Sequence, residues 1–316
     1  MANKREKSKR ERETMSFFAW ILSLIQSFFV KPDEIKNSEE IKLIVPNVVD
    51  PVVESSNKRA LLIGSNFKFT SSPLSGCLND LNNIKSWLQT RGFSDITMIA
   101  DDQELKPTRA TIVAQLTEFL KKTTTETLYI HFSGHGTQIG ASKLSEESDG
   151  KDECICTCEG KYIDIITDNE MNKLIRDHLP VEATLYIIFD CCHSGSILDL
   201  RYTYDNDTNN WMESTSINQT ECGRIIMMSG CVDEGTSADA QITDSNNKVT
   251  FQGALTCSLL NALETNKETE IGGVYKKTVQ FLIDNQFDQY PLLSTNTPFV
   301  LTSPYLPYAE TQTPLP

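Results

Sequence analysis

The chain has 316 residues, of which 39% are hydrophobic and 23% are charged, and its formal net charge is -14. This size is enough to bury one large core. The acidity argues against nucleic acid as a partner, because a negative surface repels the phosphate backbone, and it favours divalent cations or basic peptides. The nine cysteines are an odd number in a chain that is not small. They indicate a reducing, intracellular (cytoplasmic) compartment with one or two functional thiols.

The first 56 residues differ from the rest and are predicted to form a basic and apolar prodomain with a linker, ahead of one domain at 57–316. Residues 1–14 hold six Lys or Arg and three Glu, and residues 15–30 carry no charge. As a helix, residues 15–30 would measure about 24 Å, shorter than the hydrocarbon core of about 30 Å. Two alternatives stay open: this segment associates with a membrane, or it is a helix that packs on protein.

Beyond the linker, short apolar runs alternate with helical patterns. The runs predicted to be buried strands are 60–64, 96–100, 128–132, 184–189 and 224–228. Apolar residues three to four positions apart predict helices around 78–88, 112–120, 171–178 and 254–263. This alternation predicts an α/β fold in which helices cover both faces of a mostly parallel sheet. The polar stretches 201–222 and 240–250 are predicted to be exposed loops.

Two of the predicted strands lead into reactive residues. Strand 128–132 leads into the glycine-flanked His135, and strand 184–189 leads into Cys191 and Cys192. If the strands are parallel, both loops lie at the same edge of the sheet, where such folds place their sites. A thiol beside a histidine loses its proton more easily, and the thiolate is the nucleophile. The pattern therefore predicts a Cys/His hydrolase.

The four histidines differ in their setting. His131 alternates with apolar residues and is predicted to be a core residue, and His178 lies near a helix end. His193 is adjacent to Cys192, and consecutive side chains usually point apart. His135, in its glycine-rich loop, is the candidate general base and acid.

Spacing alone does not decide which of Cys191 and Cys192 attacks. If Cys192 is the nucleophile, its own backbone N–H and that of Gly136 are the natural donors to an oxyanion.

Several motifs, in the same order along the chain, closely resemble those of a type I metacaspase. They are SGCLND at 75–80, SGHG at 133–136, DGKDE at 149–153, DCCHSG at 190–195, the following SILDLRYTY at 196–204 and SGCVDEGTSAD at 229–239. The likeness runs from about residue 59 to about residue 305. It is not the true caspase signature, in which Gln-Ala precedes the cysteine.

This resemblance implies a caspase-like three-layer sandwich and a monomeric cysteine endopeptidase whose catalytic domain is 57–316. It assigns the nucleophile to Cys192, directly before His-Ser-Gly, with His135 as its partner, and Cys191 becomes a small buried residue.

The resemblance also implies cleavage after Arg or Lys. The pocket for this P1 side chain, the residue before the scissile bond, would be formed by Cys77, Asp80, Ser133 and Asp190. Two carboxylates suit a basic side chain and make Asp or Glu repulsive. As alternatives, Asp80 is a helix-start charge and Asp190 orients backbone amides.

Calcium is the cofactor that the resemblance implies. The matching positions are Asp152, Asp168, Asn169 and Asp199. Calcium prefers six to eight oxygen ligands. Asn169 stands where an acidic residue is usual, which predicts a weaker site. As an alternative, Asp168 and Asn169 only cap a helix and the other acids are solvated.

Three alternate cysteines, Cys154, Cys156 and Cys158, share one face if they lie on a strand. They are predicted to be small buried side chains, with a redox or metal-inhibition role as the alternative, since their spacing is a weak match to zinc ribbons.

The resemblance also raises self-cleavage after a basic residue in a loop. The candidate residues are Lys143, Lys151, Arg201 and Lys248.

Three other functions compete with this one. The first is a catalytically impaired caspase-like scaffold, against which the intact dyad and acidic pocket residues argue. The second is a legumain-like protease, but the two carboxylates favour Arg or Lys over Asn. The third is a membrane-tethered interaction protein, based on residues 15–30.

Overall fold

The computed structural model describes residues 57–121, 127–140, 151–192, 194–195, 197–214, 222–231, 239–243, 249–287 and 289–306. The chain divides into two units, Met1–Asn47 and Val48–Pro316, and every described residue belongs to the second. The predicted prodomain, including residues 15–30, lies outside the described residues. Within them, no helix has the length and apolar character needed to cross a membrane.

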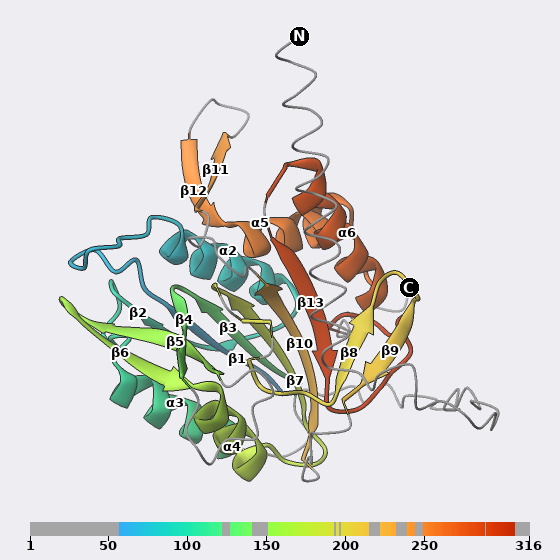
Figure 1. Ribbon diagram of the computed structural model, residues 1–316, viewed down its shortest axis with the longest axis horizontal. Helices are drawn as coiled ribbons and strands as arrows, with labels where there is room; N and C mark the ends of the chain where they lie inside the picture. The colour runs from blue at the N-terminus through green and yellow to red at the C-terminus, as the bar shows by residue number, and fades with distance from the viewer. Residues whose placement is uncertain are drawn as a thin grey trace, which may run out of the picture. The chain divides into compact units, whose positions relative to one another are not determined.

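The central sheet of the domain has eight strands. Their bounds are β1 Lys58–Gly64, β2 Asp95–Ala100, β3 Thr127–Ser133, β7 Thr184–Asp190, β8 Tyr202–Asp205, β9 Asn210–Glu213, β10 Arg224–Cys231 and β13 Tyr290–Thr295. The spatial order is β2-β1-β3-β7-β10-β13-β8-β9 (Figure 1). The first five strands in this order pair in parallel, and β13, β8 and β9 join antiparallel. The predicted mostly parallel sheet is confirmed.

Helices cover both faces of this sheet. They are α2 Cys77–Thr90, α3 Arg109–Lys121, α4 Asp168–His178, α5 Ala254–Leu260 with its π-helical extension η2 Asn261–Thr265, and α6 Ile271–Asp284. Helices α3 and α4 lie on one face, and α2, α5 and α6 lie on the other (Figure 1). In β1, Ala60 and Leu62 join the apolar cluster of the second group, whereas Leu61 and Ile63 join that of the first. Because both faces are buried, the strands are continuous apolar runs rather than alternating ones.

Two smaller sheets complete the domain. One is antiparallel, with β4 Gly136–Gly140, β5 Lys151–Glu159 and β6 Tyr162–Thr167, and the other pairs β11 Asp239–Thr243 with β12 Val249–Gly253. Figure 1 shows the β11–β12 hairpin leading directly into α5.

Two predicted loops are therefore wrong. Strands β8 and β9 lie within 201–222, and β11 and β12 take up most of 240–250. In the first case an aromatic pair holds the hairpin: the Tyr204 and Trp211 rings lie 5.6 Å apart, and Trp211 also packs on Phe299 at 5.0 Å. The surrounding Asn, Asp and Thr residues conceal this pair in the sequence.

Candidate active site

The two strands that carry the predicted dyad lie side by side. Their parallel register pairs Ser133 with Asp190, and the Gly134 N–H donates to the Asp190 carbonyl at 3.3 Å. His135 and Cys192 each follow a paired residue by two positions. Both therefore lie at the carboxyl edge of the sheet, where α/β folds place their sites.

His135 is held by contacts on two sides. Its Nε2 donates to the Ser72 carbonyl at 2.7 Å, because a carbonyl oxygen can only accept. The Phe67 ring lies 4.7 Å from the imidazole, centroid to centroid. With the proton on Nε2, Nδ1 is the basic nitrogen. The sequence did not reveal Ser72 or Phe67, because a backbone carbonyl and a ring contact leave no motif.

The loops that follow β3 and β7 contact each other at Gly136. A Cβ at Gly136 would stand 2.0 Å from the Cys192 carbonyl oxygen, so a side chain here would force the loops apart. Cys192 is buried but for 5% of its surface, and Cys191 is completely buried. Burial raises the pKa of Cys191 well above its usual value, as does the neighbouring Cys192. Cys191 thus stays protonated and is a poor nucleophile.

Two buried carboxylates lie beside these loops, and we call Asp80 and Asp190 the acidic pocket. Asp80 accepts hydrogen bonds from the Ser133 hydroxyl at 2.6 Å and from the Gly253 N–H at 2.9 Å. Asp190 accepts from the Thr256 N–H and hydroxyl at 2.8 and 2.6 Å. Three of the four predicted pocket residues are therefore together.

Both carboxylates converge on the turn between β12 and α5. A Cβ at Gly253 would stand 2.1 Å from Asp190 Oδ2 and 2.9 Å from Asp80 Oδ2. Burial, and next the charges of Asp80 and Asp190, raise the pKa of Cys257 to about 12. The fourth predicted residue, Cys77, begins α2, three positions before Asp80, and packs with Phe67 in a small apolar cluster.

A buried histidine of β3 lies next to Thr256, the residue that donates to Asp190 in the acidic pocket. His131 Nε2 lies 3.2 Å from the Thr256 hydroxyl, and burial lowers the pKa of His131 to about 3. This neutral, buried His131 matches its prediction as a core residue.

Four other acidic residues gather where β5 meets α4, and we call Asp152, Glu153, Asp168 and Asp199 the loop cluster. Burial, and next the charges of Asp168, Glu153 and Asp152, raise the pKa of Asp199 to about 7. The Glu153 N–H donates to Asp168 at 3.2 Å. Sequence reasoning did not single out Glu153.

Asn169 adds an amide to the loop cluster, since its Nδ2 donates to Asp152 Oδ1 at 3.2 Å. The helix cap of α4 is Thr167, whose hydroxyl accepts from the Glu170 N–H at 3.2 Å. Among the described side chains, no three of His, Cys, Asp or Glu are grouped as they would be around a metal ion.

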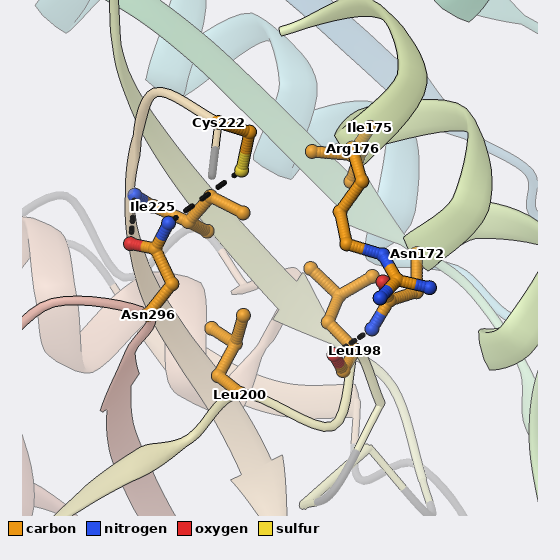
Figure 2. A pocket seen from close by; sticks show the side chains of 8 residues that line it. All are labelled: Asn172, Ile175, Arg176, Leu198, Leu200, Cys222, Ile225 and Asn296. Atoms are coloured by element: carbon orange, nitrogen blue, oxygen red, sulfur yellow. Dashed lines mark hydrogen bonds between the residues drawn. The ribbon is translucent and has the colours of Figure 1, made fainter. Parts of the chain in front are cut away.

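The loop that carries Asp199 is held by α4 (Figure 2). The Asn172 side-chain amide donates to the Leu198 carbonyl. Leu198 and Asp199 both have positive φ angles, 151° and 43°, which non-glycine residues adopt only when their surroundings hold them there.

The hollow drawn in Figure 2 lies next to this loop. It is lined by Asn172, Ile175, Arg176, Leu198, Leu200, Cys222, Ile225 and Asn296. Its volume of about 10 Å³ leaves room for no more than a water molecule. It shares no residue with the dyad or the acidic pocket, so it is a packing feature of the Asp199 loop and not a substrate site.

Comparisons with known proteins identify the family of the chain. Residues 58–201 match the family model of the metacaspase, peptidase C14 domain. Metacaspase-3 of Trypanosoma brucei brucei is 33% identical over 255 residues, which cover 75% of this chain and 71% of that protein. The chain belongs to the metacaspase family. Metacaspase-1 of Mycosarcoma maydis is 29% identical over 294 residues, covering 76% of this metacaspase and 71% of the relative.

A solved structure has the same fold. Protein GSU0716 from Geobacter sulfurreducens superposes with a TM-score of 0.55 at 22% identity, covering 77% of this metacaspase and 95% of that chain. Family membership makes this metacaspase a cysteine-type peptidase, a hydrolase that acts on peptides or proteins.

Proposed function

We propose that this metacaspase is a calcium-dependent endopeptidase that cuts after Arg or Lys, with Cys192 as nucleophile and His135 as base. The observation that carries the P1 preference is the convergence of Asp80 and Asp190 on one glycine. Both carboxylates are buried beside the loops that hold the dyad. A guanidinium or ammonium group would pair with them, whereas an acidic P1 side chain would be repelled.

The proposed reaction uses groups that lie at one edge of the sheet. The Cys192 thiolate attacks the scissile carbonyl carbon, and the backbone N–H groups of Gly136 and Cys192 stabilise the oxyanion. When the C–N bond breaks, His135 gives its proton to the leaving amine, and it then takes one from the water that hydrolyses the thioester. The Ser72 carbonyl keeps the imidazole in the required tautomer.

Entry of the P1 side chain requires a small movement. Gly253 lies against both carboxylates, and donors from Gly253 and Thr256 already occupy them. We propose that the turn between β12 and α5 shifts when substrate binds, and that the basic side chain then adds to the hydrogen bonds of Asp80 and Asp190.

The side chains proposed as calcium ligands suit the chemistry of this ion. Three carboxylates and the amide oxygen of Asn169 are hard oxygen ligands, and the raised pKa of Asp199 reflects negative charge that a cation would offset. The residues proposed to hold Ca²⁺ are Asp152, Asp168, Asn169 and Asp199. When bound, Ca²⁺ would neutralise the mutual repulsion of the loop cluster. Because these side chains are not yet grouped around one point, they must rotate toward the ion.

Self-cleavage remains part of the proposal. Lys151 is exposed at the start of β5, and Arg201 is half-exposed in an ion pair with Glu213 at 2.5 Å. Lys143 and Lys248 lie outside the described residues. Wild type mixed with the Cys192→Ala variant and calcium should yield fragments that end in one of these residues; an intact wild type contradicts this part.

For the N-terminal segment we propose membrane association through residues 15–30, in an otherwise intracellular protein, supported by the basic stretch that precedes it. The full chain should sediment with anionic vesicles, and a chain without residues 1–30 should not. Equal sedimentation of both contradicts the proposal. We also propose a monomer, which sedimentation velocity of the full chain tests directly.

Covalent labelling tests the proposed dyad and pocket together. A peptide chloromethyl ketone with Arg at P1, added with calcium, should alkylate Cys192, and mass spectrometry of the digest locates the adduct. The same chloromethyl ketone with Asp at P1 serves as the matched control and should label Cys192 far more slowly. An adduct on Cys191, or equal labelling by both reagents, contradicts the assignment.

A catalytically impaired scaffold is the second candidate. It predicts no labelling by any of these reagents and no peptide cleavage. The intact dyad and pocket residues argue against it.

A further inference from the structure

One thiol of the alternate cysteines lies across from the catalytic base. Strand β5 pairs with β4 so that Ile155 stands opposite Gly136. The same register continues to Cys156 and His135, where the Cys156 N–H donates to the His135 carbonyl at 2.9 Å. Residues directly opposite in an antiparallel pair have Cβ atoms about 5 Å apart and point to the same face. Cys156 and His135 are therefore side-chain neighbours.

The candidate nucleophile lies on this same side. Cys191 belongs to the main core cluster together with Ile155, which is on the other face of β5. The Cys192 backbone lies against Gly136, which stands opposite Ile155, so Cys192 lies beside the adjacent pair of His135 and Cys156. Cys156 also packs in one cluster with Phe67, the ring that contacts His135.

The three cysteines of β5 are not equivalent. The thiols of Cys154 and Cys158 each donate to a backbone carbonyl close by in the chain, at 3.6 and 3.4 Å. Burial, and next the proximity of Cys192, raise the pKa of Cys156 to about 11. Cys156 is thus a buried, protonated thiol beside the residue that the reaction uses as a thiolate.

We propose that Cys156 is a resolving thiol for Cys192, so that a hydroperoxide converts the pair into a disulfide and switches the peptidase off reversibly. In the first step the Cys192 thiolate attacks the peroxide; an S–O bond forms, the O–O bond breaks, and the peroxide leaves reduced as an alcohol or water. In the second step His135 takes the Cys156 proton and the Cys156 thiolate attacks the sulfenic sulfur; the S–S bond forms, and hydroxide leaves with that proton as water. A dithiol reductant reverses the change. The inference depends on the proposed function only for Cys192 as the reactive thiol.

The test uses the full chain without substrate. Wild type is treated with hydrogen peroxide, its remaining free thiols are alkylated, and it is digested without reductant for mass spectrometry. We expect a peptide pair linked through Cys156 and Cys192, together with a loss of peptidase activity that dithiothreitol restores. In Cys156→Ser the loss should become irreversible as Cys192 is oxidised further. The matched control Cys158→Ser, two residues along the same strand, should recover as wild type does.

Three results would overturn the inference: Cys192 linked to Cys191 or Cys77, Cys192 found only as a sulfinic or sulfonic acid in wild type, or full recovery in Cys156→Ser. The disulfide readout does not require peptidase activity. A Cys156–Cys192 link in a protein that cleaves no peptide would therefore defeat the proposed function and leave the redox inference standing. Peptide cleavage without the link would do the reverse.

Discussion

The acidic pocket and the loop cluster of this metacaspase differ in the groups that surround their carboxylates. In the acidic pocket, Asp80 and Asp190 each accept hydrogen bonds from a hydroxyl and a backbone N–H. In the loop cluster, burial and next the charges of Asp168, Glu153 and Asp152 raise the pKa of Asp199 to about 7, although the charge of Arg176 acts in the opposite direction. Hydrogen-bond donors hold each carboxylate of the first group, whereas mutual repulsion among the carboxylates dominates the electrostatics of Asp199 in the second.

This difference suggests two distinct tasks. Hydrogen-bond donors stabilise a charged carboxylate in the absence of any ligand, so the acidic pocket suits the attraction of a basic P1 side chain when the turn before α5 shifts. A cluster of carboxylates that repel one another responds to protons and cations, so the loop cluster suits a switch. The proposed calcium dependence and P1 preference follow from this contrast, and the following changes test it.

The largest effect is expected at the pocket. In Asp190→Asn, kcat/KM for a substrate with Arg at P1 should fall by about 100-fold or more, about 3 kcal/mol, because a desolvated charge partner is lost. The matched control is Asp177→Asn, an exposed acid that pairs with Lys173, and it should leave kcat/KM unchanged. Equal losses in both variants would remove Asp190 from the pocket.

The next largest effect is expected at Gly253, which lies in close contact with the carboxylates of the acidic pocket. Gly253→Ala places a methyl group 2.1 Å from Asp190 Oδ2, and such overpacking costs about 1–3 kcal/mol. Urea denaturation should show this loss, with reduced cleavage after Arg. Gly140, which also ends a strand, has nothing within 4 Å of its Cβ position, so Gly140→Ala should behave as wild type. Similar stabilities of the two variants would contradict the close approach.

His131, under the pocket, should make the domain sensitive to acid. Its folded pKa of about 3 lies below the unfolded value of about 6.5. The stabilisation it brings is therefore present above pH 6.5 and is lost as pH falls toward 3, because the unfolded chain binds the extra proton.

Between pH 6.5 and pH 5 this loss amounts to about 2 kcal/mol. Urea denaturation at the two pH values should therefore show a shallower dependence for His131→Gln than for wild type. Parallel pH dependences would mean that His131 is charged in the folded state.

The smallest effect is expected in the loop cluster. Asn169→Asp restores a carboxylate near Asp152, and it should lower the calcium concentration for half-maximal activity by about fivefold, about 1 kcal/mol. Asp199→Asn should raise that concentration. Neither change should alter the ratio between the rate of cleavage after Arg and the rate of cleavage after Asp. A changed P1 ratio would show that the two groups of acids are not independent.

The sequence predicts the central sheet well because its strands are buried on both faces. Such strands form continuous apolar runs, as in β3 and β7. These two strands end two positions before the predicted dyad residues, His135 and Cys192. The β8–β9 hairpin was missed because one aromatic pair, Tyr204 and Trp211, holds it among polar residues. A stretch rich in Asn, Asp and Thr has the composition of a loop, so the sequence alone predicts one there.

The site was predictable where a motif carries the chemistry. His135, Cys192, Asp80 and Asp190 stand in motifs, and the structure places them at one edge of the sheet. Gly253 was not predictable, because its contact with Asp80 joins positions 173 residues apart. The same holds for Thr256, which meets Asp190 across 66 residues, and only the folded chain brings these donors to the carboxylates.

The most direct test of the central claim is the cleavage of fluorogenic peptides that differ only at P1, as Arg, Lys, Asp or Asn, with calcium and with a chelator. Wild type should cleave the Arg and Lys peptides only when calcium is present, and Cys192→Ala should cleave none of them. Cleavage after Asp alone, or activity that survives in Cys192→Ala, would contradict the assignment of the acidic pocket and the dyad.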